Sequence, residues 1–242
     1  MKAIIEYLST KVAKPSKIKA TNDTIHQIVY DEINRLGVDA DLNHIDVSKV
    51  TTMYRSYSSY YTDGFEKSPF SNPKLNHYPD AGEDYNITKA INVDVSKWDV
   101  SNCQDFSFLF FDCTNFNCDL SNWDISSATS LNQMFTFCEN FNSDLSRWDV
   151  SHVKKMVGLF NKCLSFDFRT IANWDVSLVT DPSWMFSHLG RLLEIDRVDL
   201  SNLWFKSVHY PRWDAFNSTI LDEDKRPFVS TKDGKKHQTR LQ

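Results

Sequence analysis

Hydrophobic and polar positions in the middle of the chain follow a pattern that recurs every 25 or 26 residues. Each period contains a segment of the form Asp-Leu-Ser-x-Trp-Asp-Val-Ser, which is clearest at Asp144–Ser151. Close copies occupy Asp94–Ser101 and Asp119–Ser126, and a slightly stretched copy spans Ala172–Ser177. Repetition at this period is typical of a solenoid, in which each unit buries its apolar face only against its neighbours. The sequence therefore predicts a repeat protein.

The spacing of apolar residues predicts the form of one unit. Counted from the Ser that ends the motif, apolar residues recur at positions +2, +5, +8, +9 and +12: Val153, Met156, Leu159, Phe160 and Cys163. Steps of three with one adjacent pair place these side chains on one face of a short helix or of successive tight turns. Within the motif, Leu145 with Trp148 or Val150 suits a strand that lies parallel to its copies. One unit is expected to be a strand followed by a helical turn.

Three rows of equivalent residues are predicted to form the repeat core. Free cysteine is a small and often buried apolar residue, so a cysteine at the same register in successive units favours a packed ladder in a reducing environment. The tryptophan row is open to a second interpretation, a sugar-stacking platform, but each ring can bury so much apolar surface that an internal ladder is favoured. The predicted core residues are Trp98, Trp123, Trp148, Trp174, Cys113, Cys138, Cys163, Phe110, Phe135 and Phe160.

Two polar rows are predicted to serve the turns between strand and helix. An array of carboxylates could instead hold a metal or act in catalysis, but one equivalent residue in every coil more often satisfies backbone turns. The Ser at the end of each motif stands where a helix N-cap would stand. The predicted turn and cap residues are Asp99, Asp124, Asp149, Asp175, Ser101, Ser126, Ser151 and Ser177.

The N-terminal residues 1–40 lie outside the repeats. Residues 1–20 are basic and predict an arm or short edge element. Thr21, Asn22 and Asp23 offer capping side chains, and Gly37 is placed to end the helix. Between them the apolar residues stand at helical spacing: Ile25, Ile28, Val29, Ile33 and Leu36. This helix is expected either to cap the open end of the solenoid or to attach the chain to an assembly.

About five repeats are predicted over residues 41–203, with an insertion at about 64–90. The first motif, at Asp41–Ser48, is 53 residues before the second, which is one period of 25 plus 28 extra residues. These residues form either a loop or a degenerate repeat. Insertions in solenoids often lie on the binding face, so their aromatic residues are candidate binding residues: Phe70, Tyr78 and Tyr85.

The last predicted part, residues 204–242, combines an aromatic cap with a basic tail. The fifth unit loses its pattern, with Pro182 in place of the Met and Leu189 in place of the Cys. Residues 204–221 are rich in aromatic side chains that could close the exposed core. Beyond Asp222 the chain is polar and basic, and a loose tail is expected.

Charge and motif content exclude several functions. The net charge is -5, with net +4 on residues 1–20 and net +5 on residues 225–242, so the body between them carries -14 and is a poor nucleic-acid binder. No apolar run is long enough for a membrane span or signal peptide, and a location in a virion or the cytoplasm is expected. There is no Cys-x-x-Cys step and no catalytic arrangement of the seven His. No catalytic site, metal or cofactor is therefore expected.

The unit at Phe141–Cys163 resembles the repeat of the BspA-like family, the leucine-rich-repeat-like surface proteins of bacteria and their phages. The resemblance covers about residues 41–200 and rests on Trp-Asp-Val-Ser, on the Met and Phe of the helical turn, and on the Cys, which recur in order. It implies an α/β fold: a leucine-rich-repeat-like solenoid with a parallel β-sheet and short helical turns, preceded here by the short arm and helix. It also implies roles in adhesion, host contact or assembly.

The expected function is a non-enzymatic structural or protein-interaction module. The N-terminal arm and helix, without a secretion signal before them, favour a phage virion or assembly component whose partners are capsid or tail proteins. The alternative is a bacterial surface adhesin that binds a host-surface glycan through the insertion. The sequence leaves the oligomeric state open.

Overall fold

The computed structural model describes residues 17–54, 69–70 and 88–189 and three further short strands. Its first elements are strand β1 (Ile18–Lys19), helix α2 (Ile25–Leu36) and strand β2 (Ile45–Asp46). The 3-10 helix η1 (Phe168–Ile171) follows, and then the strands β3 (Trp204–Phe205), β4 (Phe228–Ser230) and β5 (Lys236–Gln238). Strand β1 pairs in parallel with β2; β4 pairs in parallel with β3 and antiparallel with β5. The last two strands lie where the sequence predicts a loose tail, and that expectation is wrong for these residues.

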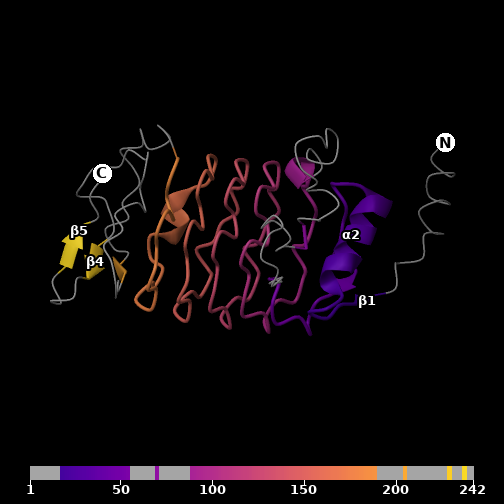
Figure 1. Ribbon diagram of the computed structural model, residues 1–242, viewed down its shortest axis with the longest axis horizontal. Helices are drawn as coiled ribbons and strands as arrows, with labels where there is room; N and C mark the ends of the chain where they lie inside the picture. Colours follow the sequence, from indigo (N-terminus) through magenta and orange to yellow (C-terminus); the bar gives the residue numbers. More distant parts are fainter. Residues whose placement is uncertain are drawn as a thin grey trace, which may run out of the picture.

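The central part of the chain is a row of coils that lie side by side (Figure 1). Parallel bridges join equivalent residues of successive coils, from Thr52 to Asp105, Ser130, Lys155 and Asp181. We number the coils from 1 to 5 by their first residues: Asp41, Asp94, Asp119, Asp144 and Thr170. The bridges within the described coils are isolated residue pairs. A leucine-rich-repeat-like α/β fold with a continuous parallel sheet therefore stays a prediction.

The motif turns twice in every coil, so the strand predicted there is absent from coils 2 to 5, and in coil 1 only the two residues of β2 form one. In coil 4, the amide of Trp148 donates to the carbonyl of Leu145 at 3.1 Å, and the amide of Val153 donates to that of Val150 at 2.9 Å. Within the same two turns, the carboxylates of Asp144 and Asp149 accept from the amides of Ser146 and Ser151. Local side-chain bonds of this kind compete with the pairing of extended strands.

The apolar segment after the motif forms successive tight turns, one of the two forms that its spacing predicts, and not a short helix. In coil 2 the amides of Leu109, Phe111 and Cys113 donate to the carbonyls three residues earlier, at 3.0–3.1 Å. Alternate amides of the same segment donate to the next coil at 2.9–3.0 Å: Phe106 to Ser130, Phe108 to Asn132, Phe110 to Met134 and Asp112 to Thr136. Residues with left-handed backbone stand at intervals of four in these segments, and a right-handed helix cannot pass through them.

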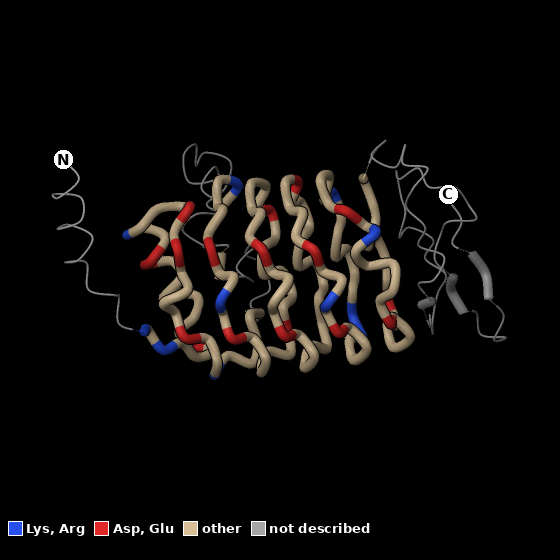
Figure 2. Tube along the Cα trace, turned by 180° about the vertical axis from the view of Figure 1, so that it is seen from behind, with Lys and Arg blue, Asp and Glu red and all other residues tan. Residues whose placement is uncertain are grey.

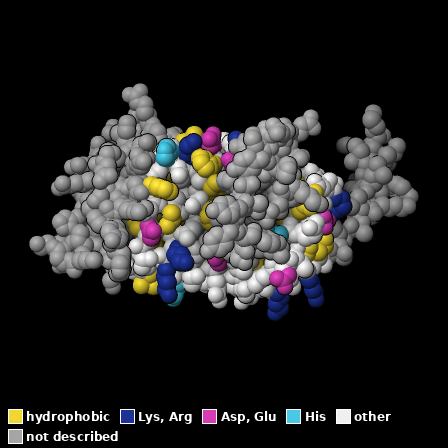
Figure 3. All heavy atoms as spheres, viewed as in Figure 1, with side chains coloured by type: hydrophobic (Ala, Val, Ile, Leu, Met, Phe, Trp, Pro, Cys, Tyr) yellow, Lys and Arg dark blue, Asp and Glu magenta, His cyan; other side chains and the backbone are white. Residues whose placement is uncertain are grey.

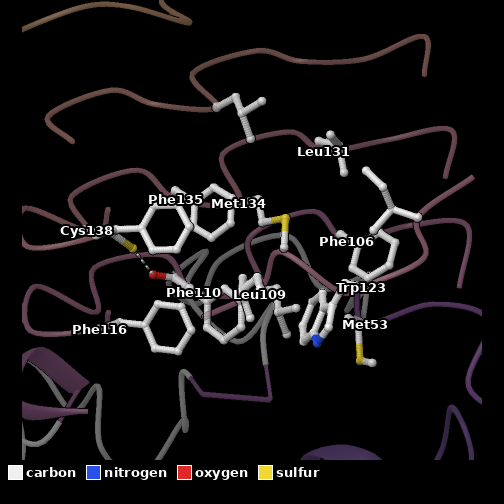
Figure 4. Close-up of a cluster of buried hydrophobic side chains, with 14 of the residues drawn as sticks. Met53, Phe106, Leu109, Phe110, Phe116, Trp123, Leu131, Met134, Phe135 and Cys138 are labelled. Atoms are coloured by element: carbon white, nitrogen blue, oxygen red, sulfur yellow. Dashed lines mark hydrogen bonds between the residues drawn. The ribbon is translucent and has the colours of Figure 1, made fainter. Parts of the chain in front are cut away.

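The core consists of side chains stacked from coil to coil (Figure 4). The ring of Phe135 lies parallel to those of Phe110 and Phe160, with ring centroids 5.8 and 5.9 Å apart. A second row joins Phe116, Phe141 and Phe166 at 5.9 and 5.7 Å. Because each ring contacts equivalents on both sides, the coils stabilise one another along the row.

The described residues at the two ends of the insertion both contact coil 2: Thr52 pairs with Asp105, and the carbonyl of Lys89 accepts from the amide of Asn115 at 3.0 Å. Coil 1 pairs directly with coil 2, at Asp41 with Asp94 and at Thr52 with Asp105, so no further coil lies between them. Phe70 stacks on the ring of Phe110 at 5.2 Å and so extends the phenylalanine row into coil 1. Among the described residues no further coil therefore lies between coils 1 and 2, and the rest of the insertion lies outside these residues.

Helix α2 packs against coil 1 at one end of the row (Figure 1). Its side chains Ile25, Val29 and Ile33 are buried in the common core, and Gly37, at φ 97°, ends the helix as the sequence predicts. No side chain caps its first turn. Asn22, a predicted cap, instead accepts from the amide of Thr51 at 2.8 Å and fixes the helix to coil 1.

Candidate functional site

The predicted carboxylate row lies in the turns of the motif. Asp149 accepts from the amide of Ser151 at 3.0 Å, and the pairs Asp99–Ser101, Asp124–Ser126 and Asp175–Ser177 repeat this bond at 3.0–3.3 Å. Acidic residues accordingly recur at the same height in neighbouring coils (Figure 2). Hydrogen bonds from Ser126 and Ser151 lower the pKa of Asp124 and Asp149. These carboxylates form Asx turns.

The four motif serines do not cap helices. The hydroxyls of Ser101 and Ser126 each donate to their own motif Asp at 2.7 Å, and no helix begins after them. The hydroxyl of Ser151 instead contacts His152. The predicted N-cap role is wrong because the following segment turns through left-handed residues and has no helical first turn to cap.

The four tryptophans of the motif lie in the interior, with 3–5% of each exposed. The indole N–H of Trp148 donates to the carbonyl of Leu120 in the preceding coil at 3.0 Å, and the other three make the same bond at 2.9–3.1 Å. The rings of Trp148 and Trp174 are parallel, 6.3 Å apart. In these positions the tryptophans cannot act as an exposed sugar-stacking platform.

All five cysteines are buried and free. The thiols of Cys138 and Cys163 each donate to a phenylalanine carbonyl of the preceding coil at 2.9 Å, and Cys113 occupies the same register in coil 2. Burial raises the pKa of Cys103 and Cys118 to about 12 and raises that of the other three as well. These thiols are therefore poor nucleophiles.

We expect the folded chain to resist thiol reagents near neutral pH. A rise in pKa from 9.0 to about 12 lowers the thiolate population about 1,000-fold, and burial slows access further. Labelling by a chromogenic disulfide reagent should be at least about 1,000-fold slower than in denaturant, where all five thiols should react. Rapid labelling of any one thiol in the folded protein would contradict the burial of the row.

The candidate binding residue Phe70 is a core residue. Only 1% of it is exposed, and it stacks between Trp98 at 6.0 Å and Phe110 at 5.2 Å. Its expected role in ligand binding is wrong because its ring fills the first position of the phenylalanine row. Tyr78 and Tyr85 lie outside the described residues.

A candidate contact surface that the sequence did not reveal lies on the left-handed turns. In coils 2 to 5, positions +7 and +11 after the motif Ser have φ between 51° and 65°; we call these residues the corner face: Phe108, Asp112, Gln133, Phe137, Gly158, Lys162, Trp184 and His188. Only one of the eight is glycine. A side chain at such a φ costs roughly 1–2 kcal/mol, so seven residues maintain a conformation that glycine would adopt with less strain.

Large side chains of the corner face reach the surface. Trp184 is 45% exposed, and Phe137 is half-buried with the ammonium of Lys162 4.8 Å from its ring centroid. Phe137 also meets the ring of Phe111 edge-on at 5.7 Å. The pKa of Asp112 is raised above its ordinary value because the carboxyl group is buried, and the charges of Lys89 and Lys162 offset only part of this rise. Figure 3 shows hydrophobic side chains between charged ones on one face of the molecule. Exposed aromatic side chains are enriched in protein contact surfaces.

The described residues contain no group of three or more His, Cys, Asp or Glu side chains arranged to hold a metal ion. None of the helices in this part of the chain is long and apolar enough to cross a membrane.

Residues 81–196 match the model of a family described as a Mycoplasma protein of unknown function, DUF285. No curated protein and no solved structure matches the chain. The match covers most of coils 2 to 5, which contain the best copies of the motif.

Proposed function

We propose that this chain is a non-enzymatic protein-interaction module that contacts its partner through the corner face. The observation that carries this proposal is the exposure of large side chains, above all Trp184, at backbone positions that favour glycine. Strained backbone is retained where the surrounding structure or a function requires the side chain. Gly158 occupies the same register as Trp184, so the fold itself does not need an aromatic ring there.

We further propose that the module belongs to the BspA-like repeat proteins, with the leucine-rich-repeat-like α/β solenoid of that family. A phage virion or another large assembly is the proposed setting, and capsid or tail proteins are the proposed partners. The repeated motif and the stacking of its coils support the family proposal. Detection of the chain in purified particles tests the setting.

The alternative partner is a host-surface glycan bound through the insertion. Phe70, one of its three aromatic candidates, is buried in the core. A protein partner is the better-supported proposal because it uses side chains that the structure shows at the surface.

Replacing Phe137 and Trp184 together by Gly should separate binding from stability. Glycine adopts a positive φ without strain, so the free energy of unfolding should change by less than about 1 kcal/mol per site. The amount of chain that co-purifies with its native assembly should fall at least about tenfold, as expected for the loss of aromatic contacts of about 1.4 kcal/mol or more. Urea denaturation and quantitative mass spectrometry of the assembly measure the two effects.

The matched control is Gly158→Ala in the same register. A Cβ at Gly158 would lie 3.2 Å from Cγ of Gln133, and φ is +60°, so this change should destabilise the chain by about 1–2 kcal/mol. Association should be unaffected under conditions in which the variant is folded. Full association of the double Gly variant would refute the corner face as the contact surface.

A further inference from the structure

The charges of the corner face change sign along the row of coils. Its +11 positions hold Asp112 in coil 2, Phe137 in coil 3 and Lys162 in coil 4. The amides of these three residues donate to the next coil at 2.9, 2.8 and 3.0 Å. Segments joined by such bonds lie about 4.8 Å apart. Asp112 and Lys162 therefore stand at about equal distances on opposite sides of Phe137.

Neither charged side chain forms an ion pair with another residue in the described part of the chain. Asp112 is half-buried, and its carboxylate accepts no hydrogen bond from these residues. The ammonium of Lys162 lies over the ring of Phe137, 4.8 Å from the ring centroid. A partly buried charge is unfavourable unless an opposite charge or a hydrogen bond compensates for it. Both groups can therefore take a partner from outside the chain.

A second copy of the chain supplies the missing charges when it is turned by 180° about an axis that crosses the row at Phe137. Coil 2 of one copy then faces coil 4 of the other, so Asp112 lies opposite Lys162 at two symmetric places. Phe137 lies opposite its own equivalent on the axis. The order acidic, aromatic, basic is thus complementary to itself when the second copy runs in the opposite direction.

The +7 positions fit the same arrangement. Phe108 in coil 2 comes opposite Gly158 in coil 4, which presents no side chain to obstruct the ring. Trp184 in coil 5 comes opposite coil 1, where Tyr54 stacks on Phe108 at 5.9 Å. Trp184 is 45% exposed, and the aromatic rings of the second copy would cover it.

We propose that the corner face binds a second copy of this chain in an antiparallel arrangement that pairs Asp112 of each copy with Lys162 of the other. This inference rests on the proposed function, because it names the partner of the same surface. The dimer is then the unit that a larger assembly incorporates. The face is only two rows wide, so the association should be weak, with a dissociation constant on the order of 10–100 µM.

Exchanging the two charges tests the pairing. Asp112→Lys places a cation opposite Lys162, and Lys162→Asp places a carboxylate opposite Asp112, so each variant should self-associate at least about tenfold more weakly than the original chain. A mixture of the two variants pairs opposite charges at both places and should associate within about threefold of the original chain. Both residues occupy the same register, so the fold accommodates either side chain. Analytical ultracentrifugation of the purified full chain, with one variant labelled in the mixture, measures the dissociation constants.

The matched control is Lys97→Asp, which makes the same change of charge at an exposed motif position of coil 2. It should alter the dissociation constant by less than about twofold. If one of the exchanged variants does not fold, Lys162→Gln should still weaken self-association at least about threefold, since it removes both ion pairs.

Two results would overturn this inference. One is a chain that stays monomeric up to about 500 µM, well above the expected dissociation constant. The other is a mixture of the exchanged variants that associates no more tightly than either variant alone. The proposed function would stand in both cases if residues of the corner face crosslink to a different protein in the native host.

Discussion

Replacing Trp148 by Ala should lower the free energy of unfolding by about 3–5 kcal/mol, the usual range for deleting a buried aromatic side chain. The ring is 4% exposed and stacks on Trp174, and its loss leaves a cavity in the core. It also leaves the carbonyl of Leu120 without its indole donor. Urea denaturation measures the change.

The damage should extend beyond coil 4. In a row of coils each unit packs only on its neighbours, so coils 3 and 5 should lose hydrogen-exchange protection along with it. Arg147→Ala is the matched control, since this neighbouring residue is exposed and should change stability by less than about 0.5 kcal/mol. An unchanged melting temperature for Trp148→Ala, with loss of a ligand, would place the tryptophan row outside the core.

Replacing Phe70 by Ala should cost a similar amount, about 3–5 kcal/mol. This effect would be unusual for a loop residue, but Phe70 is 1% exposed and its ring stacks between Trp98 and Phe110. The loss should destabilise coils 1 and 2 most. Thermal unfolding measures it.

Phe70→Leu provides the conservative control. Leucine keeps much of the buried apolar volume and should cost less than the Ala change, about 1–2 kcal/mol. A change of under about 0.5 kcal/mol for Phe70→Ala would mean that the ring does not belong to the core. The insertion would then be an ordinary surface loop.

The sequence predicted the parts of the fold that depend on apolar periodicity. The period places Phe110, Phe135 and Phe160 in equivalent positions, and the structure stacks their rings. Helix α2 was predictable from Ile25 to Gly37 because an amphipathic spacing and a terminating glycine signal the same element.

The conformation of the coils could not be predicted in the same way. Leu145 with Trp148 or Val150 suits a strand, but Asp144 and Asp149 accept from amides two residues later and bend the segment twice. Local side-chain bonds of this kind override the weak strand signal of a short apolar segment.

The corner face was missed because its usual signal is nearly absent. Glycine marks left-handed backbone in most sequences, yet Phe137 and Trp184 adopt it here, and among these positions only Gly158 carries the signal. Bonds between coils impose the conformation: Phe137 donates to Asn161 at 2.8 Å, and Gly158 donates to Ser183 at 2.8 Å. These bonds join residues of different coils, so the sequence of a single unit does not predict them.

The contact of the corner face with a protein partner is tested most directly by site-specific photo-crosslinking in the native host. A photoreactive side chain is placed at Phe137 or Trp184 on the corner face, and in parallel at Asn122 or Asn173, which are exposed in the motif. We expect protein adducts from the two corner positions and none from the two motif positions. Adducts from Asn122 and Asn173 alone would contradict the account and assign the contact to the motif.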